Sequence, residues 1–457
     1  MDRRPIVAKF GGESLSEPEL VVARVRTLIR EGYPVVVVVS ARAGVTDLLR
    51  RTLLHEEGTD DVARLIGELE RLHPGDSAAI RDGLDETARI ARRLVGNANP
   101  SAWVQDSFLG QGERLSAHWF AEYLRHQGLP ATPLEADRIG LTTDTTYGAA
   151  RILLDRSERR VRRQIDLVLR AGRIPVVTGY LGRSEEGRVA TLGRGGSDYS
   201  ASAIGAILGA HRVELVKRNV AISTADPRLV PNARTVHYLS YEEAEEIAQF
   251  GAKVLHPVTI EPAASRRVEI RVRSLNHLER TTTIGPAREG LHTRAVTLLG
   301  PLRILNLRLA GGRQRPSVIA EVSRRLAGQN VNMAAVVTTE AVLGILLDPA
   351  DAVRARSALE PFAREVGAVL GHPLPVSLVS VVGEGILDDL QRVPKSVLRG
   401  AGGLLATARS ISIVVPQDRA EEALRRLHRT FVEGRNGHGA TSRRAASSKR
   451  QGPSSVP

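Results

Sequence analysis

The 457-residue sequence contains no cysteine. This absence excludes disulfide bonds, metal sites with cysteine ligands and a thiol nucleophile. Aromatic residues make up only 3% of the chain, too few for the stacking platforms that bind single-stranded nucleic acids. The apolar run near the start is too short for a signal peptide, and no run approaches the ~20 residues that cross a bilayer. We therefore expect a cytoplasmic protein that uses neither membrane nor nucleic acid as a partner.

Lysine is also scarce, because arginine fills nearly every basic position. The five lysines are Lys9, Lys217, Lys253, Lys395 and Lys449. A compact ammonium group and a planar guanidinium group suit different sites, so a retained lysine can mark a functional position. The formal net charge is +13, and part of this surplus lies in residues 434–457, which are rich in Ser, Gly and Arg. We expect those residues to form a disordered basic tail.

Strand and helix patterns alternate up to about residue 284. Short β-rich runs lie at Ile6–Phe10, Pro34–Ser40, Ile174–Thr178 and Val213–Val216, and helical patterns lie at Glu17–Glu31, Ser107–His126, Ser157–Ala171 and Ser197–Leu208. This alternation predicts βαβ units. The five valines at Val35–Val39 predict a strand that is covered on both faces, in the middle of a mainly parallel sheet.

The remaining chain contains two similar blocks, at residues 296–350 and 376–432. Each block has the pattern of a strand, a loop, a helix and two further strands. The predicted helices are Pro316–Gln329 in the first block and Asp388–Arg399 in the second. Such a tandem repeat indicates a duplicated small module for ligand binding or dimerisation.

Two glycine- and hydroxyl-containing loops follow the first two strands. In Lys9–Ser14, paired glycines let backbone amides approach an anion and Lys9 adds a charge, although a plain glycine turn has the same pattern. In Ser40–Thr46, two hydroxyls follow the valine strand, where each is also typical of a helix cap. Open α/β sheets bind ligands beyond the carboxyl ends of their strands, which is where both loops fall.

The segment Thr191–Asp198 contains the most candidate ligand-binding groups. Three glycines surround Arg194, and Ser197 and Asp198 then begin a helix. Arg194 suits a carboxylate, and Asp198 suits a substrate ammonium group or a metal. The alternative is a capped helix beside a surface arginine. Glu113 lies in the first turns of a long predicted helix, and this position alone indicates no function.

Four segments together resemble the aspartate kinases of the amino acid kinase family. They are Lys9–Ser14, Thr191–Ser200, Thr224–Arg228 and Phe250–Pro257, which occur in the family order. The resemblance spans about residues 5–432. It implies an α/β amino acid kinase fold, a mainly parallel sheet between helices, at residues 1–284. Two ferredoxin-like ACT domains would follow, at 285–370 and 371–433. The implied reaction transfers the γ-phosphoryl group of ATP, with Mg²⁺, to the side-chain carboxylate of L-aspartate.

The resemblance also implies roles for individual residues. Lys9, Gly11, Gly12 and Asp198 would form the catalytic centre, with no protein metal ligands. The amino acid would be held by Ser40, Thr46, Glu113, Arg194, Gly195, Gly196 and Ser197, and the nucleotide by Lys217, Ser223, Arg228 and Lys253. A lysine or threonine effector at the ACT domains and a homodimer or larger assembly are implied as well.

Two segments depart from the family pattern, both on the nucleotide side. Lys217–Ala221 replaces the usual Thr-Asp-Val-Asp-Gly turn, and Ser223 replaces a tyrosine that lies beside the adenine in relatives. Glu13 replaces a small hydroxyl residue. Three functions remain open: an aspartate kinase with an altered nucleotide pocket, a kinase that phosphorylates another amino acid or uses another nucleotide, and a non-catalytic relative that regulates a partner.

Overall fold

The computed structural model describes residues 3–53, 61–75, 77–95, 97, 99–218, 221–251, 254–288, 294–309, 315–339 and 341–434. The predictions for Lys253 and for the tail beyond residue 434 lie outside them. Contacts divide the chain into two compact units. The first comprises Met1–Ile222, Thr235–Glu245 and Lys253–Glu289, and the second comprises Ser223–Arg234, Glu246–Ala252 and Gly290–Pro457.

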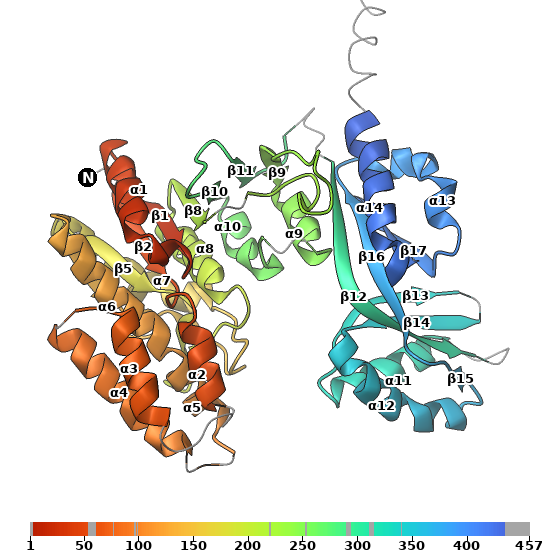
Figure 1. The fold of residues 1–457 in the computed structure, drawn as a ribbon, viewed down its shortest axis with the longest axis horizontal. Helices are drawn as coiled ribbons and strands as arrows, with labels where there is room; N and C mark the ends of the chain where they lie inside the picture. Colours follow the sequence, from red (N-terminus) through yellow and green to blue (C-terminus); the bar gives the residue numbers. More distant parts are fainter. Residues whose placement is uncertain are drawn as a thin grey trace, which may run out of the picture. The chain divides into compact units, whose positions relative to one another are not determined.

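The first unit is built on an eight-stranded sheet with the order β3-β5-β2-β1-β8-β10-β11-β9 (Figure 1). Its strands are β1 (Ile6–Phe10), β2 (Val35–Val39), β3 (Ala131–Leu134), β5 (Ile174–Thr178), β8 (Arg212–Lys217), β9 (Tyr238–Ser240), β10 (Glu269–Ser274) and β11 (Thr281–Gly285). Only β10 and β11 pair antiparallel. The predicted mainly parallel sheet is confirmed, with the valine strand β2 between β5 and β1. A small sheet joins β4 (Thr142–Thr143), β6 (Leu181–Ser184) and β7 (Val189–Thr191).

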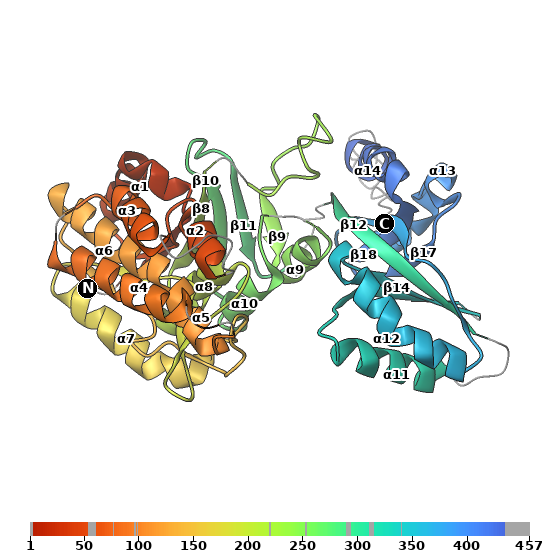
Figure 2. The ribbon, with the colours of Figure 1, turned by 60° about the horizontal axis from the view of Figure 1, so that its bottom comes forward.

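Helices cover both faces of this sheet (Figure 2). One core joins alternate residues of β1 and β2 to α1 (Pro18–Arg30), α2 (Val45–Leu53), α3 (Asp61–Leu72), α4 (Ala78–Val95), α5 (Ala102–Leu109) and α6 (Gln111–His126). The other residues of β1 and β8 face α8 (Gly196–Leu208), which packs against α7 (Leu154–Arg170) and α10 (Glu261–Ser265). The remaining helix is α9 (Tyr241–Gln249), and short 3₁₀ turns occur at Ser14–Ser16 and Pro257–Thr259. Side-chain alternation along the strands therefore separates two helical layers.

The second unit contains a seven-stranded antiparallel sheet. Its strands are β12 (Ala295–Arg308), β13 (Met333–Thr338), β14 (Val342–Leu347), β15 (Val369–Leu370), β16 (Leu374–Val382), β17 (Gly403–Ala406) and β18 (Ser410–Pro416). Its helices are α11 (Arg315–Ala327), α12 (Ala352–Glu365), α13 (Lys395–Leu398) and α14 (Ala420–His428), with 3₁₀ segments at Pro349–Asp351, Ile386–Arg392 and Gln417–Arg419 and a π-helical turn at Arg429–Glu433. One core packs α11 and α12 on β12 and β14, and another packs α14 on β16 and β18. This arrangement confirms the predicted pair of ferredoxin-like modules. They share one sheet because the 14-residue strand β12 pairs with both β14 and β16.

Two of the predicted helices are wrong in detail. The helix predicted at Ser107–His126 is divided at Gly110 between α5 and α6, since glycine is a weak helix former. The helix predicted at Asp388–Arg399 is a 3₁₀ segment followed by the short α13. Pro394 separates the two, because a proline holds the residue before it in extended backbone, as Val393 shows. None of the helices described is long and apolar enough to cross a membrane.

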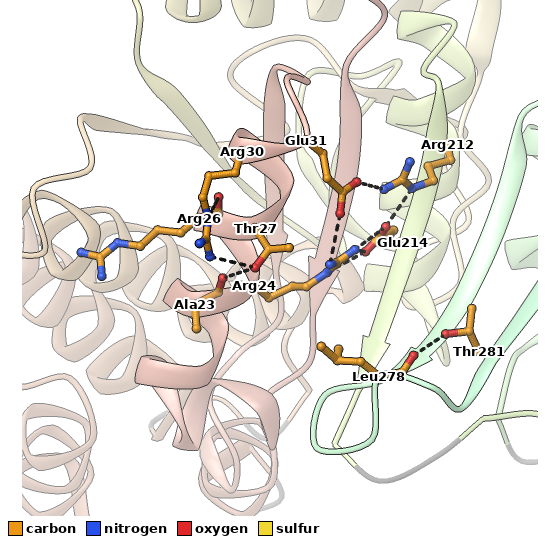
Figure 3. A network of polar contacts seen from close by, with 10 residues as sticks. All are labelled: Ala23, Arg24, Arg26, Thr27, Arg30, Glu31, Arg212, Glu214, Leu278 and Thr281. Atoms are coloured by element: carbon orange, nitrogen blue, oxygen red, sulfur yellow. Dashed lines mark hydrogen bonds and ion pairs between the residues drawn. The ribbon is translucent and has the colours of Figure 1, made fainter.

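A buried network of charges fixes β8 to α1 (Figure 3). Glu214, which is fully buried, accepts hydrogen bonds from Arg24 at 2.7 Å and from Arg212 at 2.8 Å. Arg212 also reaches Glu31 at 2.8 Å. Burial raises the pKa of Glu214, but the two arginines outweigh this effect and hold that pKa below its usual value. The network determines which face of β8 meets α1, and so leaves the opposite face for α8.

We expect Glu214→Gln to lower the free energy of unfolding by about 3–5 kcal/mol at pH 7, because it leaves two buried arginines with only the more exposed Glu31 to compensate their charge. Since the folded-state pKa of Glu214 is depressed, its contribution is present above the unfolded-state pKa and disappears as the pH falls through the folded-state pKa. Urea denaturation at pH 7 and at pH 4 measures both effects, and the two proteins should differ less at pH 4. The exposed Glu86→Gln, which breaks a surface pair with Arg89, is the control. Equal losses from both variants at pH 7 would contradict the prediction.

Candidate functional site

The carboxyl ends of β1, β2 and β5 meet at one edge of the first sheet. The amide of Ser40 donates to the carbonyl of Phe10 at 3.2 Å, and the amide of Gly179 donates to the carbonyl of Val39 at 2.8 Å. The loops that follow these strands therefore lie side by side. The structure brings the predicted segments 9–14 and 40–46 together at the edge where open α/β sheets bind ligands.

Gly12 is the point of closest approach between these two loops. A β-carbon at Gly12 would lie 2.5 Å from the carbonyl oxygen of Ala41 and 2.9 Å from the amide nitrogen of Ala43. Any other residue would push the loops apart. At Gly11, a β-carbon would lie 3.5 Å from Nζ of Lys9. The bare backbone of Gly11 therefore stays within reach of a ligand that contacts the Lys9 ammonium group.

Lys9, Asp198 and Lys217 form a buried charge cluster. Nζ of Lys9, on β1, lies 2.8 Å from Oδ1 of Asp198, in the first turn of α8. Lys217, at the end of β8, pairs with the other carboxylate oxygen. Burial raises the pKa of Asp198, but the two ammonium groups outweigh it and lower that pKa to about 2. Asp198 is therefore ionised at neutral pH, while burial lowers the pKa of Lys9.

Glu113 is a second buried carboxyl group at this edge, in the first turn of α6. Its side chain accepts a backbone hydrogen bond from Ala41 in the second loop, and Lys9 attracts it. Burial is the larger effect and raises the pKa of Glu113 to about 8. Its Oε2 is buried without a hydrogen-bond partner. Glu113 thus has an unused acceptor that a ligand ammonium group could fill.

The other predicted amino acid contacts lie in the same loops. Ser40 and Thr46 are half-buried, Gly196 and Ser197 are buried, and the side chain of Arg194 is exposed. An exposed arginine beside buried polar groups is able to take a carboxylate from solution.

Gly195 allows the turn that leads into α8. Its φ of 75° is in the left-handed region, and a β-carbon there would lie 2.6 Å from the β-carbon of His256. Glycine is thus required for both backbone conformation and space. His256 packs against this turn.

Two residues that the sequence analysis did not single out position the Thr191–Asp198 segment. Asp106 accepts hydrogen bonds from the amide and hydroxyl of Thr191, at 2.7 and 2.8 Å, and from the amide of Gly148 at 2.9 Å. Tyr180, which follows β5, has a φ of 66°, rare for a bulky residue, and its carbonyl accepts from Leu192. Asp106 is the one charged residue of helix α5, which was the available signal for it, whereas nothing in the sequence marked Tyr180.

The predicted nucleotide contacts are divided between the two units. Lys217 belongs to the first unit, in the charge cluster, whereas Ser223 and Arg228 belong to the second. Arg228 is exposed and pairs with Asp226 at 2.7 Å. Glu13, the other departure from the family pattern, is exposed to solvent.

The acidic side chains described at this sheet edge do not form a metal site. Across the part of the chain that the structure describes, no group of three or more His, Asp or Glu side chains could hold a metal ion. Both oxygens of Asp198 are paired with ammonium groups, and the raised pKa of Glu113 makes it a poor metal ligand at neutral pH. The residues present therefore do not fit a protein-held divalent cation.

Comparisons with known proteins decide the family. The sequence profile described as the amino acid kinase family matches residues 4–274, more than half of the chain. The chain belongs to the amino acid kinase family. Among its relatives in this family, the aspartokinase of Thermus thermophilus is 29% identical, over 80% of this chain and 96% of the relative. The lysine-sensitive aspartokinase 3 of Escherichia coli is 27% identical, over 94% of this chain and 99% of the relative.

Solved structures of the family agree with the fold. Aspartokinase III of E. coli, in complex with aspartate and ADP, matches with a TM-score of 0.77 at 25% identity, covering 93% of this chain and 99% of that protein. The aspartate kinase of Clostridium acetobutylicum matches with a TM-score of 0.71 at 19% identity, covering 94% and 100% of the two chains, and so shows the fold alone. The resemblance to aspartokinases is confirmed by these comparisons.

We expect Glu113→Gln to change how stability depends on pH. Between the ordinary pKa of 4.5 and the folded-state value of about 8, folded wild type holds a proton that the unfolded chain has lost. The free energy of unfolding contributed by this group therefore falls as the pH rises from 5 to 8. Glu113→Gln removes that slope, so its melting temperature should decline less over this range. Thermal melts of wild type, this variant and the exposed Glu70→Gln test this, and parallel curves for all three would contradict it.

Proposed function

We propose that this chain is an aspartate kinase. It transfers the γ-phosphoryl group of ATP to the side-chain carboxylate of L-aspartate, and the products are 4-phospho-L-aspartate and ADP. The observation that carries this proposal is the buried Lys9 beside Asp198 and the Gly11–Gly12 backbone, at the same sheet edge as Glu113. The near-complete match to a family member with aspartate and ADP bound supports it.

The reaction needs charge stabilisation more than acid–base chemistry. A carboxylate is already ionised at neutral pH, so one of its oxygens attacks the γ-phosphorus without a general base. A new oxygen–phosphorus bond forms, the bond to the oxygen that bridges the β- and γ-phosphates breaks, and its electron pair leaves with ADP. Lys9 and the amides at Gly11 and Gly12 stabilise the negative charge that spreads over the transferring group.

The amino acid is proposed to bind between the first helical turns and the loops. The carboxyl group of Glu113 faces the ammonium group of aspartate, and this contact favours the ionised form of Glu113. Arg194 takes the α-carboxylate with two parallel hydrogen bonds, while Ser40 and Thr46 contribute hydroxyl groups. Gly195, Gly196 and Ser197 bring the backbone close to the same ligand. Asp198 contributes by holding the ammonium groups of Lys9 and Lys217 in position.

The nucleotide is proposed to be ATP, bound by Lys217, Ser223, Arg228 and Lys253. Mg²⁺ is its proposed companion, and as a Lewis acid it neutralises phosphate charge when bound. Because the described residues near Lys9 do not fit a divalent cation, we assign its ligands to the phosphate oxygens of ATP and derive no step through it.

The second unit is proposed to be regulatory. The limits 285–370 and 371–433 are our proposed ACT domains, following a catalytic domain at 1–284. A lysine or threonine effector binding there is supported by aspartokinase III of E. coli in complex with lysine and aspartate, which matches with a TM-score of 0.71 at 25% identity. We propose a homodimer or larger assembly, and a cytoplasmic location, where ATP and free aspartate are available.

Hydroxylamine trapping tests the proposed reaction. Wild type incubated with ATP, Mg²⁺ and L-aspartate should form a hydroxamate that requires the nucleotide and the amino acid. Lys9→Ala should lower its rate by about 10²–10³-fold, as expected for the loss of a group that stabilises the transition state. Lys395→Ala, which removes an exposed lysine of the second unit, is the matched control and should retain full activity.

The same assay separates the other functions. Product with GTP or with another acidic amino acid, but not with ATP and aspartate, indicates a kinase of changed specificity. If no combination gives product while aspartate still binds, the protein is a non-catalytic relative. Full activity in Lys9→Ala would refute the role of that lysine.

A further inference from the structure

The cluster of Lys9, Asp198 and Lys217 carries a surplus positive charge. Two ammonium groups share one carboxylate, and both of its oxygens are paired. The side chains of Lys9 and Asp198 are 7% and 6% exposed, and that of Lys217 is 23% exposed. Charges in such a site are weakly screened, so the surplus acts strongly on any ligand that enters.

Strand alternation places the two lysines on the same face of the sheet. β1 and β8 pair in parallel, with Lys9 opposite Leu215. Lys217 lies two residues further along β8 and therefore on the same face of the sheet as Lys9. Asp198, in the first turn of α8, lies over this face and is paired with both lysines. The beginning of the 13-residue helix α8 adds its own partial positive charge.

The cluster fits an anion and opposes a cation. A divalent cation or a ligand ammonium group would have to displace a lysine from Asp198 and would meet the surplus charge. An anionic group that contacts both ammonium groups compensates that charge, and it also offsets the cost of burying Lys9. Lys217 is the more exposed of the two lysines, so it is the one that an incoming ligand reaches from solution.

We propose that Lys9 and Lys217, held by Asp198, form one binding site for the terminal phosphoryl group of ATP, in which Lys217 supplies positive charge that a protein-held divalent cation would otherwise provide. This inference rests on the proposed kinase function. It has the consequence that affinity for the γ-phosphate depends on Lys217 and persists without a metal ion.

Calorimetric titration in EDTA, without aspartate, tests this directly. ATP and ADP are titrated separately into the full-length wild type and into Lys217→Met, which keeps the length of the side chain but removes its charge. Lys217→Met should bind metal-free ATP about tenfold more weakly, the loss expected for a charge-assisted contact. Its affinity for ADP should change less than about twofold, because ADP lacks the γ-phosphate. Lys217→Arg, which keeps the charge, should retain most of the affinity for ATP.

Arg218→Met is the matched control. Arg218 is the next residue and carries the same charge, but it pairs with Glu17 instead of Asp198. Its replacement should shift the affinities for ATP and ADP equally. A second readout is the gain in ATP affinity when Mg²⁺ is added, which should be larger in Lys217→Met than in wild type.

The outcomes separate this inference from the proposed function. Unchanged ATP affinity in Lys217→Met, or the same loss in Arg218→Met, overturns the role of Lys217. If wild type still forms the hydroxamate from ATP and aspartate, only this inference fails. A wild type that binds neither nucleotide, with or without Mg²⁺, overturns both.

Discussion

Burial of the Lys9 ammonium group beside Asp198 is the constraint around which the first unit is organised. An unpaired buried ammonium group is too costly to persist, so the first turn of α8 has to lie directly over β1 and β8. The tight approach of α8 relies on small residues in this helix and on the left-handed turn at Gly195. On the other face, the pairing of Glu214 with Arg24 holds β8 against α1.

Two buried carboxyl groups at the same sheet edge differ in charge at neutral pH, because one is ionised and the other is protonated. Lys9 and Lys217 lower the pKa of Asp198 to about 2, whereas burial raises the pKa of Glu113 to about 8. At neutral pH the edge therefore carries more positive than negative charge. Such a site suits two substrates that are both anionic, and it brings their mutually repelling groups together at a lower electrostatic cost.

The sequence predicted the sheet and the loops that meet at its carboxyl edge, because those features follow local rules. Five consecutive valines favour a central strand, and the glycine segments follow strand ends. The pairing of Lys217 with Asp198 could not be predicted, because it depends on which strands are neighbours and on the register between β1 and β8. The strained backbone of Tyr180 and the three hydrogen bonds to Asp106 also depend on tertiary contacts. The break at Gly110 was missed because helical periodicity continues across it.

The segment Ser223–Arg234 belongs to the second unit although it precedes part of the first in the chain. The carbonyl of Thr224 accepts from Val296 on β12 at 2.7 Å, its hydroxyl lies 3.0 Å from His428, and Leu229 accepts from Arg425 on α14 at 2.9 Å. This segment also carries Ser223 and Arg228, two proposed nucleotide contacts. An effector that shifts β12 or α14 would therefore move those proposed contacts through these hydrogen bonds. Deleting the second unit would then remove these two proposed nucleotide contacts together with the proposed effector site.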